Sequence, residues 1–284
     1  MISAITGLAL AQFPERPIFR ASAPPGLTAM TQNAILPVDQ LWRSIRREAE
    51  GVLASDPLFG ASLSSAISDH PDLGSALAHQ IGERLGKGAE DRARFARVAR
   101  EAFHAAPELV DAASLDLQSI ALHDPAIDRL LPPLLNYKGY VALQAWRVSN
   151  WLWSENRTDL ALLLQSLSSD TLQVSIHPSA SIGTSVYLDH ATGIIVGAFA
   201  VIGDEVTFMQ NVTIGRKQAL PGRAPRIGRG VLLSSGATIL GDISVGDFAK
   251  IGAGSVVERD VPAACTAVGV PAQLVNCAEA GLPA

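Results

Sequence analysis

Six histidines are the side chains of this 284-residue chain best suited to acid–base chemistry near neutral pH, because an imidazole gains and loses its proton in that range. His190 directly follows Asp189, whereas His177 precedes a proline, which favours a structural role at a turn. Solvated or capping roles are expected for the other four, which are scattered through the first half: His70, His79, His104 and His123. No cluster of His, Cys and Asp has the spacing of metal ligands, so no metal site is predicted.

A concentration of cations indicates a second place where a ligand could bind. Residues 215–226 contain two glycines, two prolines and four cations: Arg216, Lys217, Arg223 and Arg226. This composition predicts a loop, and loops on a rigid scaffold commonly carry function. A solvated insertion without function is the alternative.

The elements that position these residues follow a six-residue repeat after residue 175. Apolar anchors recur in three runs: Ile176, Ile182, Leu188 and Ile194; Val196, Ile202, Phe208 and Ile214; and Ile227, Leu233, Ile239, Val245, Ile251 and Val257. The second run is shifted by two residues from the first, and the cationic loop separates it from the third. This period predicts a triangular β-solenoid with the loop ejected from it, and the length of the third run argues against a β-sandwich with chance spacing.

From Val38 to about Leu172 the apolar residues recur at helical spacing instead. This pattern predicts seven or eight helices with short connections. Asp56, Asp69 and Asp124 lie near prolines at expected helix starts and are candidate caps.

The composition excludes several classes of protein. A hydrophobic content of 48% with 17% charged residues argues against disorder, and a net charge of -5 argues against nucleic-acid binding. No run of 18 apolar residues is present, so no membrane span is expected. Cys265 and Cys277 cannot build a disulfide scaffold, and so few cysteines suit a reducing cytoplasm. Aromatic residues make up only 5%, as expected if a narrow prism forms much of the core.

Over about residues 38 to 275 the chain resembles the serine O-acetyltransferase family of hexapeptide acyltransferases. The motifs that carry the resemblance are Asp-His-Ala-Thr-Gly at 189–193, Asp-Pro-Ala-Ile-Asp at 124–128, Leu-Gln-Ala-Trp-Arg at 143–147, and matches at 251–257 and 268–272. The resemblance implies an α+β chain. An α-helical domain over 36–173 precedes a left-handed parallel β-helix over 174–275, with the loop ejected at 215–226. Residues 1–35 are expected to form a disordered extension, or translation starts at Met30, and residues 276–284 form a short tail.

The resemblance implies transfer of the acetyl group of acetyl-CoA, the co-substrate, to the hydroxyl of L-serine, giving O-acetylserine for cysteine biosynthesis. His190 would remove the hydroxyl proton. Asp124 and Asp189 would hold the amino group of serine, and Arg223 its carboxylate. The positions expected near CoA, between neighbouring subunits, are Gly215, Lys217, Ser235, Lys250 and Ala253.

Four departures from the family pattern surround the expected site. Ser175 stands where the family has an aspartate that orients the catalytic histidine, and a hydroxyl cannot stabilise an imidazolium equally well. Ala224 replaces a histidine after Arg223, and Gly-Arg-Lys-Gln at 215–218 replaces Gly-Gly-Thr-Gly-Lys. The tail lacks the terminal Ile that docks into O-acetylserine sulfhydrylase, which argues against that complex.

Three interpretations follow from an intact scaffold with a changed acceptor side. The favoured one is a serine O-acetyltransferase with compensating groups. The others are a paralogous CoA-dependent acyltransferase with another small acceptor, and a weakly active homologue that binds a ligand or partner and regulates. The resemblance implies a homotrimer, or a dimer of trimers paired through the helical half, and a cytoplasmic location is expected.

Overall fold

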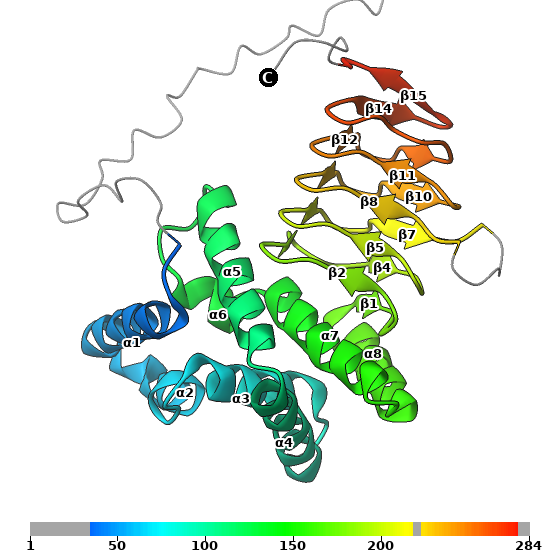
Figure 1. Cartoon of the computed structure of the whole chain (residues 1–284). Helices are drawn as coiled ribbons and strands as arrows, with labels where there is room; N and C mark the ends of the chain where they lie inside the picture. Colours follow the sequence, from blue (N-terminus) through cyan, green and yellow to red (C-terminus); the bar gives the residue numbers. More distant parts are fainter. Residues whose placement is uncertain (1–34, 218–222, 278–284) are drawn as a thin grey trace, which may run out of the picture. The chain divides into compact units, whose positions relative to one another are not determined.

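The computed structural model describes residues 35–217 and 223–277 (Figure 1). The expectations for residues 1–34, for residues 218–222 of the predicted loop and for the end of the tail therefore lie outside the described residues.

The first part of the described chain is helical, as the spacing predicts. Its helices are α1 (Val38–Ser55), α2 (Gly60–Leu63), α3 (Leu73–Leu85), α4 (Ala89–Ala105), α5 (Glu108–His123), α6 (Leu131–Asn136), α7 (Lys138–Ser154) and α8 (Thr158–Leu172). A 3-10 turn, η1 (Pro57–Phe59), and a π turn, η2 (Ser64–Ser68), flank α2. The amphipathic pattern of α1 shows why: Leu41, Trp42, Ile45 and Ala49 recur on one face, and all four are buried.

One of the three predicted caps is confirmed. The Asp56 carboxylate accepts the N–H of Leu58 at the start of η1. The prediction for Asp69 is wrong, because α3 is capped by Asp72. It is also wrong for Asp124, which ends α5 and accepts the Ala126 N–H, so this side chain closes a turn and caps no following helix.

The second part is a parallel β-solenoid with three sheets, which confirms the interpretation of the six-residue repeat (Figure 1). The first sheet contains β1 (Val174–Ile176), β4 (Ile194–Val196), β7 (Thr213–Gly215), β10 (Thr238–Leu240) and β13 (Val256–Val257). The second contains β2 (Ser181–Ile182), β5 (Val201–Ile202), β8 (Arg226–Ile227) and β11 (Ser244–Val245). The third contains β3 (Tyr187–Leu188), β6 (Thr207–Phe208), β9 (Leu232–Leu233), β12 (Lys250–Ile251), β14 (Thr266–Gly269) and β15 (Ala272–Val275). Only β14 and β15 pair antiparallel among these described strands.

The apolar anchors of the repeat fill the prism between the sheets. Each is buried, and Ile182, the most exposed of them, is only 8% exposed. Successive side chains of a strand point to opposite faces, so the residue before each anchor points outward. Phe208 is the one ring among the anchors, which agrees with a prism too narrow for many aromatic side chains.

Two interruptions break the regular coil of three hexads. Ile214 pairs with Val196 one regular coil earlier, but the coil that joins Val196 to its partner Ile176 is longer by two residues. The two extra residues lie in the corner between β3 and β4, which contains His190. The coil that joins Ile239 to its partner Ile214 is longer still, because the cationic segment is inserted between β7 and β8.

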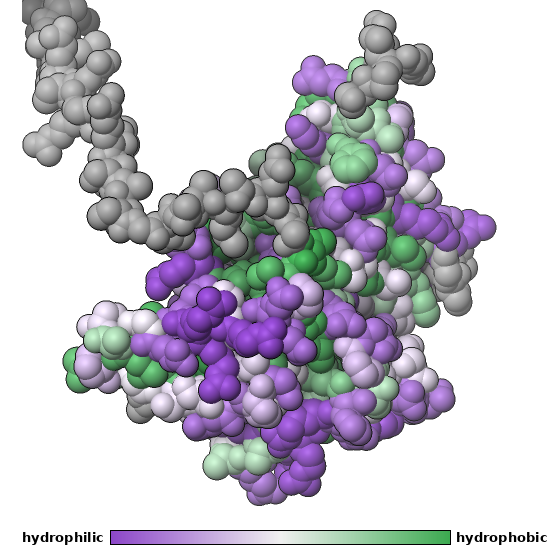
Figure 2. All heavy atoms as spheres, turned by 60° about the vertical axis from the view of Figure 1, so that its left-hand side comes forward, coloured by the Kyte–Doolittle hydropathy of each residue, from purple (hydrophilic) through white to green (hydrophobic). Residues whose placement is uncertain are grey.

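The helical part packs directly on the first coil of the solenoid. Helices α7 and α8 contact β1, and α5 and α7 contact β3. Figure 2 shows hydrophilic side chains over much of the helical surface and hydrophobic ones gathered where the two parts adjoin. Within the residues that are described, none of the helices has the length and apolarity to cross a bilayer.

A disulfide joins Cys265 and Cys277, on either side of the β14–β15 hairpin. The low cysteine count does not predict this bond. Because disulfides persist mainly in oxidising compartments, it weakens the argument from cysteine number for a reducing cytoplasm.

Candidate active site

Three of the predicted site residues meet in one cleft of about 540 Å³ between α5, the start of α7 and β3. These are Asp124, Asp189 and His190. Side chains to which the sequence analysis assigned no catalytic or binding role line the same cleft, among them His123, Tyr137, Lys138 and Tyr187.

The Asp124 carboxylate has three polar contacts just after α5. Its Oδ1 accepts the Ala126 N–H at 2.9 Å, and its Oδ2 lies 2.9 Å from the Tyr137 hydroxyl and 3.0 Å from the Tyr187 hydroxyl. Burial opposes ionisation of this carboxyl, but the hydrogen bonds together outweigh it and lower the pKa of Asp124. The side chain is therefore an anion at neutral pH.

Tyr187 connects this carboxylate to the second one. Its hydroxyl lies 3.0 Å from Asp124 Oδ2 and 3.0 Å from Asp189 Oδ1. Burial and the two carboxylates raise the pKa of Tyr187 well above its usual value, and burial with the Asp124 hydrogen bond raises the pKa of Tyr137 to about 12. Both phenols therefore remain protonated and can donate hydrogen bonds to the carboxylates of Asp124 and Asp189.

His190 occupies the widened corner of the solenoid with a left-handed backbone, φ 55°. Its Nε2 lies 3.6 Å from Asp189 Oδ1, and its side chain is 71% exposed. The imidazole can thus reach a hydroxyl bound in the cleft, and Asp189 faces the charge that it would acquire.

Lys138 ties this corner to the first turn of α7. Its ammonium donates to Thr192 Oγ1 at 2.6 Å and to Gln173 Oε1 at 3.1 Å. The Gly193 N–H also donates to the Gln173 carbonyl, at 2.9 Å. The corner that carries His190 is therefore hydrogen-bonded both to Lys138 of α7 and to Gln173 before β1.

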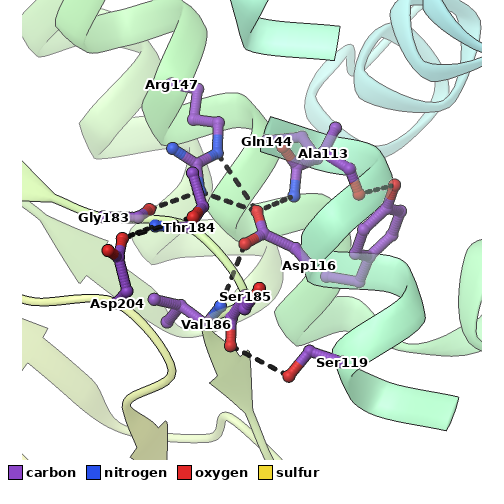
Figure 3. A network of polar contacts seen from close by, with 11 residues as sticks. Ala113, Asp116, Ser119, Gln144, Arg147, Gly183, Thr184, Ser185, Val186 and Asp204 are labelled. Carbon is purple, nitrogen blue, oxygen red and sulfur yellow. Dashed lines mark hydrogen bonds and ion pairs between the residues drawn. The ribbon is translucent and has the colours of Figure 1, made fainter. Parts of the chain in front are cut away.

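A buried ion pair holds the helices against the solenoid (Figure 3). Asp116 Oδ2 accepts from Arg147 Nη2 at 2.7 Å and Nε at 3.1 Å and from Gln144 at 3.1 Å, while Oδ1 accepts the Val186 N–H at 3.0 Å. Arg147 also donates to the Gly183 carbonyl at 2.8 Å. Losing one partner of such a pair typically costs about 3–5 kcal/mol, because the other charge stays buried alone.

The same face of α5 makes a second bond to the solenoid. Ser119, one turn after Asp116, donates to the Ser185 carbonyl at 2.9 Å (Figure 3). Both contacts fall just before β3, which begins at Tyr187, and α5 ends at His123, next to Asp124. The helix end and the strand are thus pinned together, which brings the two carboxylates to one site.

Glycine allows the start of α7 to touch β3 directly. A Cβ on Gly139 would lie 2.3 Å from the Leu188 carbonyl oxygen, closer than packing permits. This close approach places Tyr137 and Lys138 beside the cleft.

The remaining predicted residues lie elsewhere in the single chain. Ser175 is half-buried on β1, and its Oγ accepts from Gln165 of α8 at 3.2 Å. Arg223 is exposed in the segment before β8, at the corner between the first and second sheets, whereas His190 lies at the corner between the third and first. Ala224, which follows Arg223, is buried.

The positions predicted for CoA divide into two groups. Ser235 and Ala253 belong to the column of corners that begins at His190, since Asn211 N–H donates to Thr192, Gly236 N–H to Gln210 and Gly254 N–H to Ser235. Gly215 ends β7, and Lys217 pairs with Glu258 at 2.9 Å, so both lie at the corner of the ejected segment. Lys250 begins β12 and is exposed on the third sheet.

His177 and His123 lie as expected, whereas His79 is neither solvated nor a cap, because it lies half-buried within α3 and burial lowers its pKa. His177 lies at a corner with its Nδ1 accepting the Ser179 N–H, and burial together with Arg216 lowers its pKa. His123 caps α5, its Nδ1 lying 2.8 Å from the Ser119 carbonyl, although it also lines the cleft. In the described part of the chain no group of three or more His, Cys, Asp and Glu side chains could hold a metal ion.

Sequence reasoning missed the two tyrosines, although one signal was present. Tyr187 precedes the anchor Leu188, so it points out of the prism, yet it is only 4% exposed. Helices α5 and α7, which contact β3, cover this ring.

Comparison with known proteins identifies the family. The family model for the N-terminal part of serine acetyltransferases matches residues 41–145, and the bacterial transferase hexapeptide model matches residues 224–259. The serine acetyltransferase of Salmonella typhimurium is 43% identical over 245 residues, which cover 85% of this chain and 90% of the relative.

Solved structures agree with this assignment. A soybean serine acetyltransferase complexed with serine superposes with a TM-score of 0.81 at 42% identity, covering 84% of this chain and 98% of the other. A serine acetyltransferase in complex with CoA has a TM-score of 0.82 at 39% identity, covering 84% of this chain and all of the other. Because this chain has the helical part and the solenoid of these proteins and is similar to them along both, it belongs to the serine acetyltransferase family.

Proposed function

We propose that this chain transfers the acetyl group of acetyl-CoA to the hydroxyl of L-serine and releases O-acetylserine and CoA. The observation that carries the proposal is the meeting of Asp124, Asp189 and His190 in one cleft. Two carboxylates suit the ammonium group of an amino acid, and the adjacent imidazole suits the removal of a hydroxyl proton. The relative solved with serine supports the choice of acceptor.

In the proposed mechanism, His190 accepts the serine hydroxyl proton while the oxygen attacks the thioester carbonyl. The carbon–sulfur bond then breaks, and His190 returns the proton to the departing CoA thiolate. Asp189, 3.6 Å from His190 Nε2, stabilises the imidazolium between these two steps. Ser175, where the family has an aspartate, lies outside the cleft of a single chain, and its proposed weaker orienting role would act on the His190 of a neighbouring chain.

Arg223 is proposed to bind the carboxylate of serine in an assembled oligomer. Within one chain it lies at a different corner from His190, so a neighbouring chain would supply it. A homotrimer with sites between subunits fits this requirement and the exposure of His190. Outward apolar residues also support association, since Ile195, Phe199 and Val201 are 48%, 42% and 41% exposed. Two trimers paired through their helical halves are the larger alternative, and light scattering distinguishes the two.

The donor site is proposed to follow the column of corners that begins at His190 and includes Ser235 and Ala253. The remaining positions assigned to CoA, Gly215, Lys217 and Lys250, would face it from a neighbouring chain. The relative solved with CoA supports acetyl-CoA as the donor.

We also propose a cytoplasmic location. The small number of cysteines supports it, and the disulfide between Cys265 and Cys277 argues the other way. Thiol titration of the protein isolated from its own cells, with alkylation at lysis, tests it: a cytoplasmic protein would yield two free thiols, and an intact Cys265–Cys277 disulfide would contradict the location.

A thiol-release assay with acetyl-CoA tests the function. Acceptors should include L-serine, D-serine, L-homoserine and L-glycerate, which has the hydroxyl and carboxylate of serine but no amine. Turnover is expected with L-serine far above the others. Turnover only with a different acceptor would replace serine in this proposal, and no turnover with any acceptor would contradict it.

A further inference from the structure

The Tyr187 hydroxyl is a bridge between two carboxylates that it cannot satisfy at once. It lies 3.0 Å from an oxygen of Asp124 and 3.0 Å from an oxygen of Asp189, yet a phenol carries a single proton. Donation to one carboxylate leaves the other contact without a hydrogen between two oxygens. The two carboxylates therefore lack one hydrogen-bond donor at this bridge.

Tyr137 does not remove this shortage. Its hydroxyl donates to Asp124 Oδ2 at 2.9 Å, the same oxygen that Tyr187 reaches. Asp124 already accepts hydrogen bonds from Tyr137 and from the Ala126 N–H. We therefore assign the Tyr187 proton to the hydrogen bond with Asp189. The Tyr187 oxygen then faces Asp124 without a proton.

The bridge also limits how far apart the carboxylates can be. Because the same oxygen of Tyr187 lies 3.0 Å from both, Asp124 Oδ2 and Asp189 Oδ1 cannot be more than about 6 Å apart. An ammonium nitrogen that donates to two carboxylates at about 2.7–2.9 Å needs its acceptors no farther apart than this. Without the Tyr187 hydroxyl between them, the negatively charged carboxylates of Asp124 and Asp189 would repel each other and move apart.

We propose that Tyr187 is a specificity-determining residue that holds Asp124 and Asp189 at the spacing of a bridging ammonium group. It thereby selects acceptors that carry a protonated amine beside the reacting hydroxyl. The bound ammonium supplies the donors that the substrate-free site lacks. This inference rests on the proposed function for the identity of the acceptor, L-serine.

The three tyrosines of the chain form a matched series for the test, each changed to Phe in the full-length protein. Tyr187→Phe is expected to raise KM for L-serine about tenfold, since a hydrogen bond to a charged group is lost, and to change kcat less than about twofold. KM for acetyl-CoA should not change. Tyr137→Phe, which affects one carboxylate, should raise KM for L-serine by about threefold.

Tyr140→Phe is the structural control. The Tyr140 hydroxyl is buried and donates to the Ala113 carbonyl at 3.1 Å, away from the cleft. Its loss should lower the melting temperature and leave KM for L-serine unchanged. An equal rise of KM in Tyr140→Phe and Tyr187→Phe would assign Tyr187 a structural role only and overturn the proposal.

A binding measurement separates this inference from the proposed function. Calorimetry with L-serine and with L-glycerate, without acetyl-CoA, should show that Tyr187→Phe reduces the preference for L-serine by about tenfold. An unchanged preference would overturn the role of Tyr187 even if the wild-type protein acetylates serine. A wild-type protein that acetylates no acceptor but loses this preference in the variant would contradict the function and support the site.

Discussion

The two interruptions of the solenoid differ in size and in what surrounds them. The corner between β3 and β4 gains two residues and is attached to α7 through Lys138. The segment between β7 and β8 lengthens its coil by more than a whole hexad, and Lys217 at its start pairs with Glu258. The shorter interruption carries the imidazole and one of the two carboxylates.

This difference shows that the size of an irregularity is a poor guide to its chemistry. The cationic segment was conspicuous in the sequence, whereas the shift of two residues between anchor runs looked like a minor change of register. Catalytic groups must be held by their neighbours, and the short corner of His190 is bonded to Lys138 of α7. The long segment is better suited to contacting a neighbouring chain.

Removal of the imidazole is expected to have the largest effect. His190→Ala should lower kcat for acetyl transfer by about 10²–10⁴-fold, the usual contribution of a general base, because the acceptor hydroxyl keeps its proton. Steady-state kinetics and a melting curve check that activity is lost and the fold is kept.

His104→Ala is the matched control, since this exposed histidine ends α4 away from the cleft. Its activity should equal that of the wild type. A His190→Ala enzyme with near-normal kcat would remove His190 from the mechanism and leave the widened corner without its proposed chemistry.

An intermediate effect is expected from the cationic segment. Arg223→Ala should raise KM for L-serine roughly tenfold to a hundredfold with little change in kcat, because a charge-assisted contact to the substrate carboxylate is lost. Arg226→Ala is the control, since Arg226 pairs with Asp242 at 3.5 Å at the base of the same segment. Equal effects of the two variants would mean that the segment contributes charge without a specific contact.

The smallest expected effect is a gain. Ser175→Asp should increase kcat by about two- to tenfold if a missing carboxylate limits the stabilisation of protonated His190. Ser175→Asn, similar in size but uncharged, should give no gain. A Ser175→Asp enzyme no faster than the wild type would mean that Asp189 alone already orients the imidazole.

The fold was largely predictable because the solenoid repeats a local pattern. Each hexad needs an apolar anchor such as Ile239, and the prism repeats that requirement along the chain, so the period is visible without knowing any distant contact. The helical part was predictable only as helices, because caps depend on local geometry. Asp124, expected at a helix start, closes the turn after α5.

Site residues that belong to a family motif could be predicted from the sequence, whereas residues that reach the site only through tertiary packing could not. Asp124, Asp189 and His190 came from the family resemblance, and the structure brings them together. The roles of Tyr137 and Tyr187 follow from the approach of α5 and α7 to β3, and no sequence period reports such an approach. Arg223 and Ser175 are outside the cleft of a single chain, so their roles remain predictions.

The sequence by itself determined the order of helices before solenoid, the burial of every anchor and the family of the protein, because these depend on patterns read along the chain. Only the tertiary structure decided that Tyr187 lies between two carboxylates. That juxtaposition depends on the buried Asp116–Arg147 pair and on the space left by Gly139, which join segments that are far apart in the chain. The negative charge of the cleft follows from the residue types of Asp124 and Asp189, which the sequence gives. Its selectivity is proposed to come from the distance between these carboxylates, which the packing sets.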